Sequence, residues 1–143
     1  MIINVANDSD FSIYNIPFGI FSTEGTQPRA GVAIGDSIID LHALGKLKVW
    51  DFDISVLETT CLNDFISLGK GVTSKVRSDI QAWLKEASSP LGLNKDILFV
   101  KQSNATMHMP VKIGDYTDFY SSIEHATNVG IMFRDLANAL MPN

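Results

Sequence analysis

Short apolar runs separated by turn residues fill the first forty positions of the chain. Residues 16–21 form one run, and a proline near its start favours an edge strand. Residues 29–34 and 37–41 form two more runs, with glycine and aspartate at positions 35 and 36 between them. Glycine as the first turn residue is typical of a type II′ hairpin. This pattern predicts a small β-sheet or barrel at the start of the chain.

Apolar residues recur every three or four positions in the middle of the chain, which favours helices. Residues 43–47 and 62–69 predict two short helices, and Gly69 ends the second. A longer amphipathic helix is predicted over residues 73–87, and Ser88-Ser89-Pro90 ends it. Its apolar face, which we interpret as core packing, consists of Val72, Val76, Ile80, Trp83, Leu84 and Ala87.

The chain changes character near residue 100. Residues 91–96 are typical of a linker, and residues 97–100 predict a strand. Polar, aromatic and ionisable side chains then become dense up to residue 134. We therefore predict an N-terminal domain over residues 1–100 and the start of a second, incomplete domain over residues 101–143.

A helix start is predicted inside this second region. Ser121 and Glu124 lie three positions apart and form a capping-box pattern, which predicts a helix beginning near Ser122. His125 then falls in its first turn. Asp118 and Tyr120 fall in the extended stretch before it, where alternation places both side chains on the same side.

Composition and charge narrow the classes of function. Hydrophobic residues make up 45% and charged residues 19% of the chain, a balance typical of globular domains. The net charge is −5 and the 11 Lys and Arg residues are scattered, so we expect no nucleic-acid partner. A single cysteine, Cys61, excludes an internal disulfide. The sequence lacks a signal-peptide pattern and any apolar run of membrane-spanning length, which predicts a cytoplasmic protein with no membrane partner.

Four side chains around the predicted helix carry groups that are useful in catalysis. The Asp118 carboxylate is a hard ligand for Ca²⁺ or Mg²⁺, and the His125 imidazole suits a general base at neutral pH. The Arg134 guanidinium can bind a carboxylate through two hydrogen bonds, and the Tyr120 hydroxyl can bond a substrate oxygen. Ordinary roles also fit, because an Asp before a helix is commonly a cap, a helical His is commonly structural, and an exposed Arg commonly forms a weak ion pair. Spacing alone leaves both interpretations open.

A family resemblance adds to this picture. Residues 115–122, 124–130 and 132–134 resemble the first active-site segment of the fumarylacetoacetase family. The resemblance extends upstream, although residues 46–95 are its least distinctive part. The upstream segments that resemble the family are residues 10–21, 28–36 and 105–110.

The resemblance implies a fold and an activity. The family has a small SH3-like N-terminal barrel, followed by a β-rich catalytic domain that forms homodimers, so the expected fold class is α+β and β-rich. Its members hydrolyse 4-fumarylacetoacetate, a diketo acid, to fumarate and acetoacetate in tyrosine and phenylalanine catabolism. The resemblance implies that Asp118 is a metal ligand for Ca²⁺ or Mg²⁺ and that His125 is the general base. It implies that Tyr120 and Arg134 contact the substrate.

The length of the chain departs from the family pattern. The family's remaining metal ligands and oxyanion donors come from later in a much longer chain, and one carboxylate cannot hold either cation firmly. We therefore expect this chain to be inactive alone, as a fragment, a short isoform or the product of a truncated gene model. We also expect the region after about residue 100 to be poorly packed unless another chain covers it. The alternative is a non-catalytic binding or regulatory module derived from the enzyme.

Three further residues have no suggestive neighbours in the sequence. His42 and His108 lack a partner cluster, and Cys61 has no base at a catalytic spacing. We interpret all three as structural, since small buried cysteines are usually inert.

Overall fold

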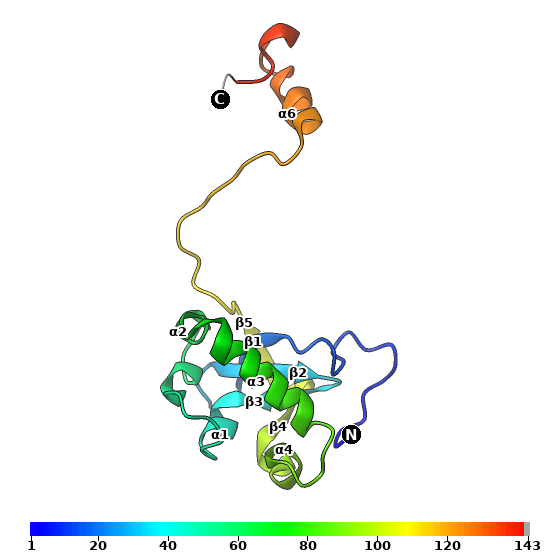
Figure 1. Ribbon diagram of the computed structural model, residues 1–143, viewed down its shortest axis with the longest axis vertical. Coiled ribbons are helices and arrows are strands. Elements are labelled where there is room, and N and C mark those ends of the chain that lie inside the picture. Colours follow the sequence, from blue (N-terminus) through cyan, green and yellow to red (C-terminus); the bar gives the residue numbers. More distant parts are fainter. Residues whose placement is uncertain (142–143) are drawn as a thin grey trace. The chain divides into compact units, whose positions relative to one another are not determined.

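The computed structural model describes residues 1–141, and the chain divides into two compact units between Lys112 and Ile113. The first unit contains a sheet and most of the helices (Figure 1). The second contains helix α6 (Ile123–Gly130) and the short 3-10 helix η3 (Leu136–Asn138). None of the helices within residues 1–141 combines the length and the apolar character that crossing a membrane requires.

The sheet of the first unit has five antiparallel strands in the order β4-β3-β2-β1-β5. Each edge strand, β4 or β5, pairs with one neighbour, and no pairing within residues 1–141 joins the two edges, so the sheet is open. The predicted α+β class is confirmed, whereas the SH3-like barrel is not. The strands are β1 (Phe18–Thr23), β2 (Arg29–Ile34), β3 (Ser37–Asp40), β4 (Phe99–Lys101) and β5 (Ala105–His108).

The hairpin predicted at positions 35 and 36 is confirmed. It joins β2 to β3, and Ile34 pairs directly with Ser37 across the turn. Gly35 has a φ of 56°, whereas Asp36 is not among the residues with positive φ. Positive φ at the first turn residue alone is the type II′ pattern, and glycine adopts it without steric cost.

The helices follow the predicted pattern in part. α3 begins four residues before the predicted start and ends at Trp83, and Val76 and Ile80 of its apolar face are buried. Gly69, at a φ of 85°, marks the end of α2 as expected. The helices of the first unit are α1 (Leu41–Gly45), α2 (Asn63–Ser67), α3 (Gly69–Trp83), α4 (Pro90–Leu93), α5 (Lys95–Leu98) and the 3-10 helices η1 (Ile54–Leu57) and η2 (Gln102–Asn104).

The linker predicted over residues 91–96 is wrong, because α4 and α5 occupy this stretch. The Ser89 hydroxyl accepts a hydrogen bond from the Gly92 N–H at 3.1 Å, and Pro90 takes the first helical position. Serine at the cap followed by proline is a signal for a helix start. The strand predicted at residue 97 therefore begins only at Phe99.

A single apolar core lies between the sheet and α3, which crosses one face of the sheet (Figure 1). The α3 side chain of Arg77 donates hydrogen bonds to the carbonyls of Ile16 and Tyr14, and Gln81 donates to the carbonyl of Ile13. These bonds hold the segment before β1 against the helix, where Ile13 and Ile16 are buried.

The first unit extends past residue 100 because β5 returns to pair with β1. Its end is fixed by Asn63, whose side-chain amide donates to the Lys112 carbonyl at 3.0 Å and accepts from the Lys112 N–H at 2.8 Å. The assignment of the later residues to the start of a catalytic domain stays a prediction.

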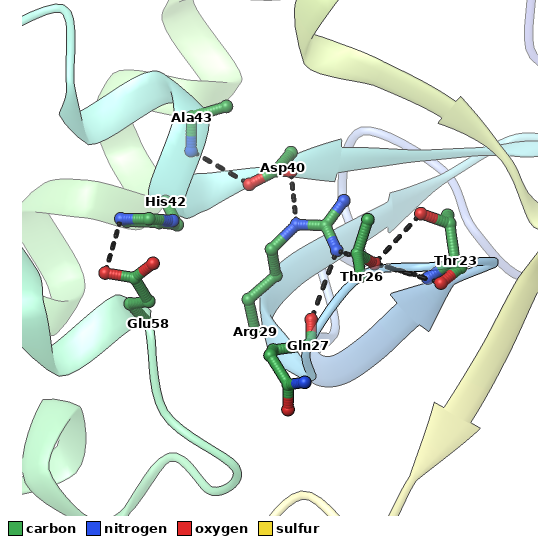
Figure 2. Close-up of polar contacts among 8 residues, drawn as sticks. All are labelled: Thr23, Thr26, Gln27, Arg29, Asp40, His42, Ala43 and Glu58. Atoms are coloured by element: carbon green, nitrogen blue, oxygen red, sulfur yellow. Dashed lines mark hydrogen bonds and ion pairs between the residues drawn. The ribbon is translucent and has the colours of Figure 1, made fainter.

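A buried ion pair links β2 to β3 (Figure 2). Arg29 Nε donates to Asp40 at 2.6 Å, and the two side chains are 14% and 9% exposed. The guanidinium also donates to Thr26 at 2.8 Å and lies 4.3 Å from the centroid of the Phe21 ring. The second oxygen of Asp40 accepts the Ala43 N–H at 2.9 Å and so caps α1. One pair of side chains therefore fixes a strand pair, a turn and a helix start.

Changing Asp40 to Asn should lower the free energy of unfolding by about 3 kcal/mol, because the Arg29 charge then stays buried without its partner. Asp36→Asn is the matched control, since Asp36 pairs with Lys101 through side chains that are 69% and 62% exposed. The control should change the stability by less than about 1 kcal/mol. Urea denaturation of both variants measures the difference, and equal losses would contradict the role given to the Arg29 pair.

A pair of glycines gives a second prediction about packing. A Cβ on Gly31 would lie 2.7 Å from Phe21 and Ile38 side-chain atoms, so Gly31→Ala should lower the free energy of unfolding by about 1–3 kcal/mol. A Cβ on Gly71, in α3, would meet no atom within 4 Å, and Gly71→Ala should stabilise by roughly 0.5 kcal/mol. The thermal midpoint should fall in Gly31→Ala and rise in Gly71→Ala. An unchanged midpoint in Gly31→Ala would show that the Phe21 ring can move aside.

Candidate active site

The start of α6 positions the candidate residues of the second unit. Ser122 is extended, with φ −130° and ψ 126°, and its hydroxyl oxygen accepts the His125 N–H at 3.2 Å. The same hydroxyl donates to the Glu124 carboxylate at 2.9 Å. The predicted helix start near Ser122 is confirmed. The capping residue is Ser122 and not Ser121, because only a serine three positions before His125 reaches that N–H across the first turn.

The four candidate residues lie on either side of this cap and are all exposed. Asp118 and Tyr120 precede α6 in a stretch without regular secondary structure, and His125 is in the first turn as predicted. Arg134 follows the helix, and its N–H donates to the carbonyl of Gly130 at 2.9 Å.

The structure brings two of these residues into direct contact. The ring centroids of Tyr120 and His125 are 5.1 Å apart, with an angle of 57° between the ring planes. A tilted arrangement at this distance is favourable for aromatic rings. The imidazole of His125 and the phenol of Tyr120, which can donate a hydrogen bond, therefore lie next to each other.

Tyr120 and Arg134 share a different feature, an open hollow of about 760 Å³. Its walls are largely apolar and include Phe119, Ile123 and Phe133. A hollow with apolar walls, a phenol and a guanidinium suits a small organic acid, because the guanidinium binds carboxylates in a planar fork. Asp118 and His125 are not among the residues that line it.

Gly130 is a residue whose role the sequence interpretation missed. A Cβ at this position would lie 2.0 Å from the carbonyl oxygen of Ala139. Only glycine therefore allows the backbone at Ala139 to pack this closely against the end of α6. Arg134 Nη1 lies 3.5 Å from the same carbonyl oxygen, at the long limit for a hydrogen bond. The signal in the sequence was a glycine at the last helical position, four residues before Arg134.

The apolar side chains after α6 are largely uncovered within the second unit. Val129 is half-buried, whereas five other large apolar side chains within residues 131–140 are exposed. Those exposed residues are Ile131, Met132, Phe133, Leu136 and Leu140.

The donors for a metal ion are incomplete in the part of the chain that the structure describes. Asp118 offers an exposed carboxylate, which fits a hard cation. Within residues 1–141, however, no three His, Cys, Asp or Glu side chains gather in a way that could hold a metal ion. Any cation held by Asp118 therefore needs further ligands from elsewhere.

The two other histidines have polar partners that the sequence did not reveal. His42 Nε2 lies 3.2 Å from the Glu58 carboxylate, and the His42 side chain is 8% exposed (Figure 2). His108 Nε2 lies 2.8 Å from the Ser22 hydroxyl, across β1 and β5. The expected lack of partners is corrected, and both contacts join elements of the fold, as a structural role requires. Cys61 is partly exposed.

Comparison with known proteins decides the family. Residues 14–110 match the family described as fumarylacetoacetase N-terminal. The chain belongs to this family. The curated fumarylacetoacetase of Rattus norvegicus is 48% identical over 148 aligned residues, which cover 99% of this chain and 35% of the relative. Those of Homo sapiens and Dictyostelium discoideum are each 49% identical with the same coverage.

The coverage limits what the fumarylacetoacetase likeness establishes for this chain. The chain spans about a third of the length of these relatives, at 35%. The family match ends at residue 110, before the candidate residues. The alignment with the rat relative covers 99% of the chain and therefore includes them.

Glu124 provides a prediction about the helix start. Its pKa lies below the ordinary value, because its own backbone N–H and the Ser122 hydroxyl donate hydrogen bonds to the ionised carboxylate. Ionised Glu124 therefore stabilises α6 above the unfolded pKa of about 4.3, and this contribution is lost as the pH falls through the lower folded pKa. An NMR titration of the carboxyl carbon should show the low midpoint, and Ser122→Ala should raise it. If Glu124 titrated at its ordinary pKa in both the unchanged chain and the Ser122→Ala variant, the hydrogen bond between Ser122 and Glu124 would be contradicted.

Proposed function

We propose that this chain is the N-terminal portion of a fumarylacetoacetase, which cleaves a C–C bond of 4-fumarylacetoacetate to give fumarate and acetoacetate in tyrosine and phenylalanine catabolism. The observation that carries the proposal is 48% identity to a curated fumarylacetoacetase over 99% of the chain. The contact between the rings of Tyr120 and His125 supports placing both residues in one site.

In this proposal His125 acts as the general base. Its exposed imidazole takes a proton from a water molecule, whose oxygen bonds to the carbonyl carbon of the fumaryl group, and the same proton is later given to the leaving carbon. The C–C bond then breaks, its electron pair passes to the acetoacetate carbon, and that carbon takes up a proton. Arg134 binds a substrate carboxylate and Tyr120 donates to a substrate oxygen, so that the attacked carbon is held in place.

We propose Asp118 as a ligand for Ca²⁺ or Mg²⁺. An exposed carboxylate suits either hard cation, and roughly six to eight oxygen ligands are needed for Ca²⁺ and about six for Mg²⁺, so other parts of the enzyme must contribute. When bound, such a cation would polarise the oxygens of the diketone.

The chain alone is then an incomplete catalyst. The exposed apolar side chains after α6 offer a surface against which other parts of the enzyme would pack. The homodimer and the SH3-like barrel stay predictions that rest on the family resemblance, and the cytoplasmic location stays a prediction from the sequence pattern. The net charge of −5 supports a small-molecule substrate over nucleic acid.

Four proteins test the proposed function. The 143-residue chain with Ca²⁺ or Mg²⁺ should not consume 4-fumarylacetoacetate, whereas a fusion of this chain to the downstream part of the rat relative should. His125→Ala in the fusion should lower kcat by about 10²–10⁴-fold, the usual contribution of a general base. His108→Gln is the matched control and should leave turnover near that of the fusion, since His108 belongs to the sheet.

Each other outcome has a defined meaning. Turnover by the chain alone would show that its site is complete. Normal turnover by the His125→Ala fusion would exclude His125 as the base. An inactive fusion, together with tight binding of the chain to a longer subunit, would favour a non-catalytic module instead.

A further inference from the structure

The Ser122 hydroxyl makes two contacts that together fix the first turn of α6. It accepts the backbone N–H of His125 and donates to the Glu124 carboxylate. The Ser122 carbonyl in addition accepts the N–H of Ala126 at 3.0 Å. A hydroxyl that is held by a carboxylate on one side and by an N–H on the other cannot rotate freely. The backbone of His125 is therefore tied to one side-chain atom.

The contact between Tyr120 and His125 crosses this turn. Tyr120 lies two residues before Ser122, in the stretch without regular structure, and His125 lies three residues after it, inside the helix. The 5.1 Å between their ring centroids depends on the angle at which the chain enters α6. That angle is set at Ser122, the residue whose extended φ and ψ separate the two stretches.

The neighbouring serine does not share this arrangement. Ser121 is exposed, whereas Ser122 is half-buried, and the bond to the His125 N–H comes from Ser122. The two serines are thus a matched pair, with the same side chain one position apart.

We propose that Ser122 is a positioning residue, which holds the imidazole of His125 against the ring of Tyr120 by capping the turn between them. The inference rests on the proposed function only in giving His125 the role of base. The contact itself is a property of the second unit. Ser122 acts through the backbone of His125, whose N–H its hydroxyl accepts.

The contact is tested in the 143-residue chain by NMR, without any assay of turnover. Ser122→Thr keeps the hydroxyl, and Ser122→Val replaces it with a methyl group in a side chain of the same shape. Cross-peaks between the Tyr120 and His125 rings should persist in the Thr variant and vanish in the Val variant. The Val variant should also shift the His125 ring protons to the values found in Tyr120→Leu, in which the neighbouring ring is absent.

Ser121→Val is the control for the position of the substitution. It should leave the cross-peaks between the two rings and the His125 ring-proton shifts unchanged. Persistence of the ring contact in Ser122→Val would overturn the proposal. Equal loss of contact in Ser121→Val and Ser122→Val would also overturn it, since the effect would then belong to β-branched residues in this stretch and not to the cap.

Turnover by the fusion to the rat relative's downstream part gives a second, separate reading. Ser122→Val should lower kcat on the order of tenfold, because misplacement of a base by about 1 Å can cost up to 10²-fold, and Ser122→Thr should restore it. If His125→Ala abolishes turnover while the Val and Thr variants match each other, the positioning role fails and the proposed function stands. If the NMR contact follows the cap while His125→Ala leaves turnover intact, the role of His125 as the base fails and the positioning of its ring by Ser122 stands.

Discussion

The buried ion pair of Arg29 and Asp40 is the interaction on which the first unit depends. Charges that leave water must be paired and hydrogen-bonded, and here the contacts of the guanidinium come from β3, from the turn before β2 and from β1. Asp40 ties it to the end of β3 and to the cap of α1, Thr26 ties it to the turn before β2, and Phe21 of β1 lies beneath it. Gly31 completes the arrangement, because the absence of a side chain leaves room for the Phe21 ring. The pairing of β2 with β3 and the start of α1 thus share one pair of side chains.

Local rules were enough for part of this fold. The type II′ turn at Gly35 and the apolar face of α3 follow from single residues and from periodicity, and both are present. α4 was missed because Ser89 and Pro90 can signal either the end of one helix or the start of another; the preceding helix ends at Trp83, and the two residues begin α4. The pairing of β5 with β1 was missed for a different reason. Strand pairing over a long separation is decided by tertiary packing, which no local window contains.

The candidate site divides in the same way. The position of His125 in the first turn of α6 followed from the spacing of serine and glutamate, with an error of one residue in the cap. The contact with Tyr120 could not follow from alternation along a strand, because the chain turns between the two residues. Neither pattern nor geometry within residues 1–141 places a group of three His, Cys, Asp or Glu side chains where they could hold a metal ion, so the proposed role of Asp118 rests on the family resemblance alone.

The pairing of β1 with β5 has a consequence for synthesis. Ser22 and His108, whose side chains meet across these strands, are 86 positions apart in the chain. A ribosome must therefore release nearly all of the first unit before the outer edge of β1 finds its partner, and an unpaired edge is a template for other chains. Once β5 docks, that edge is closed. Tyr120 and His125 follow β5 in the chain, so all five strands of the sheet are synthesised before the segment that carries the candidate residues.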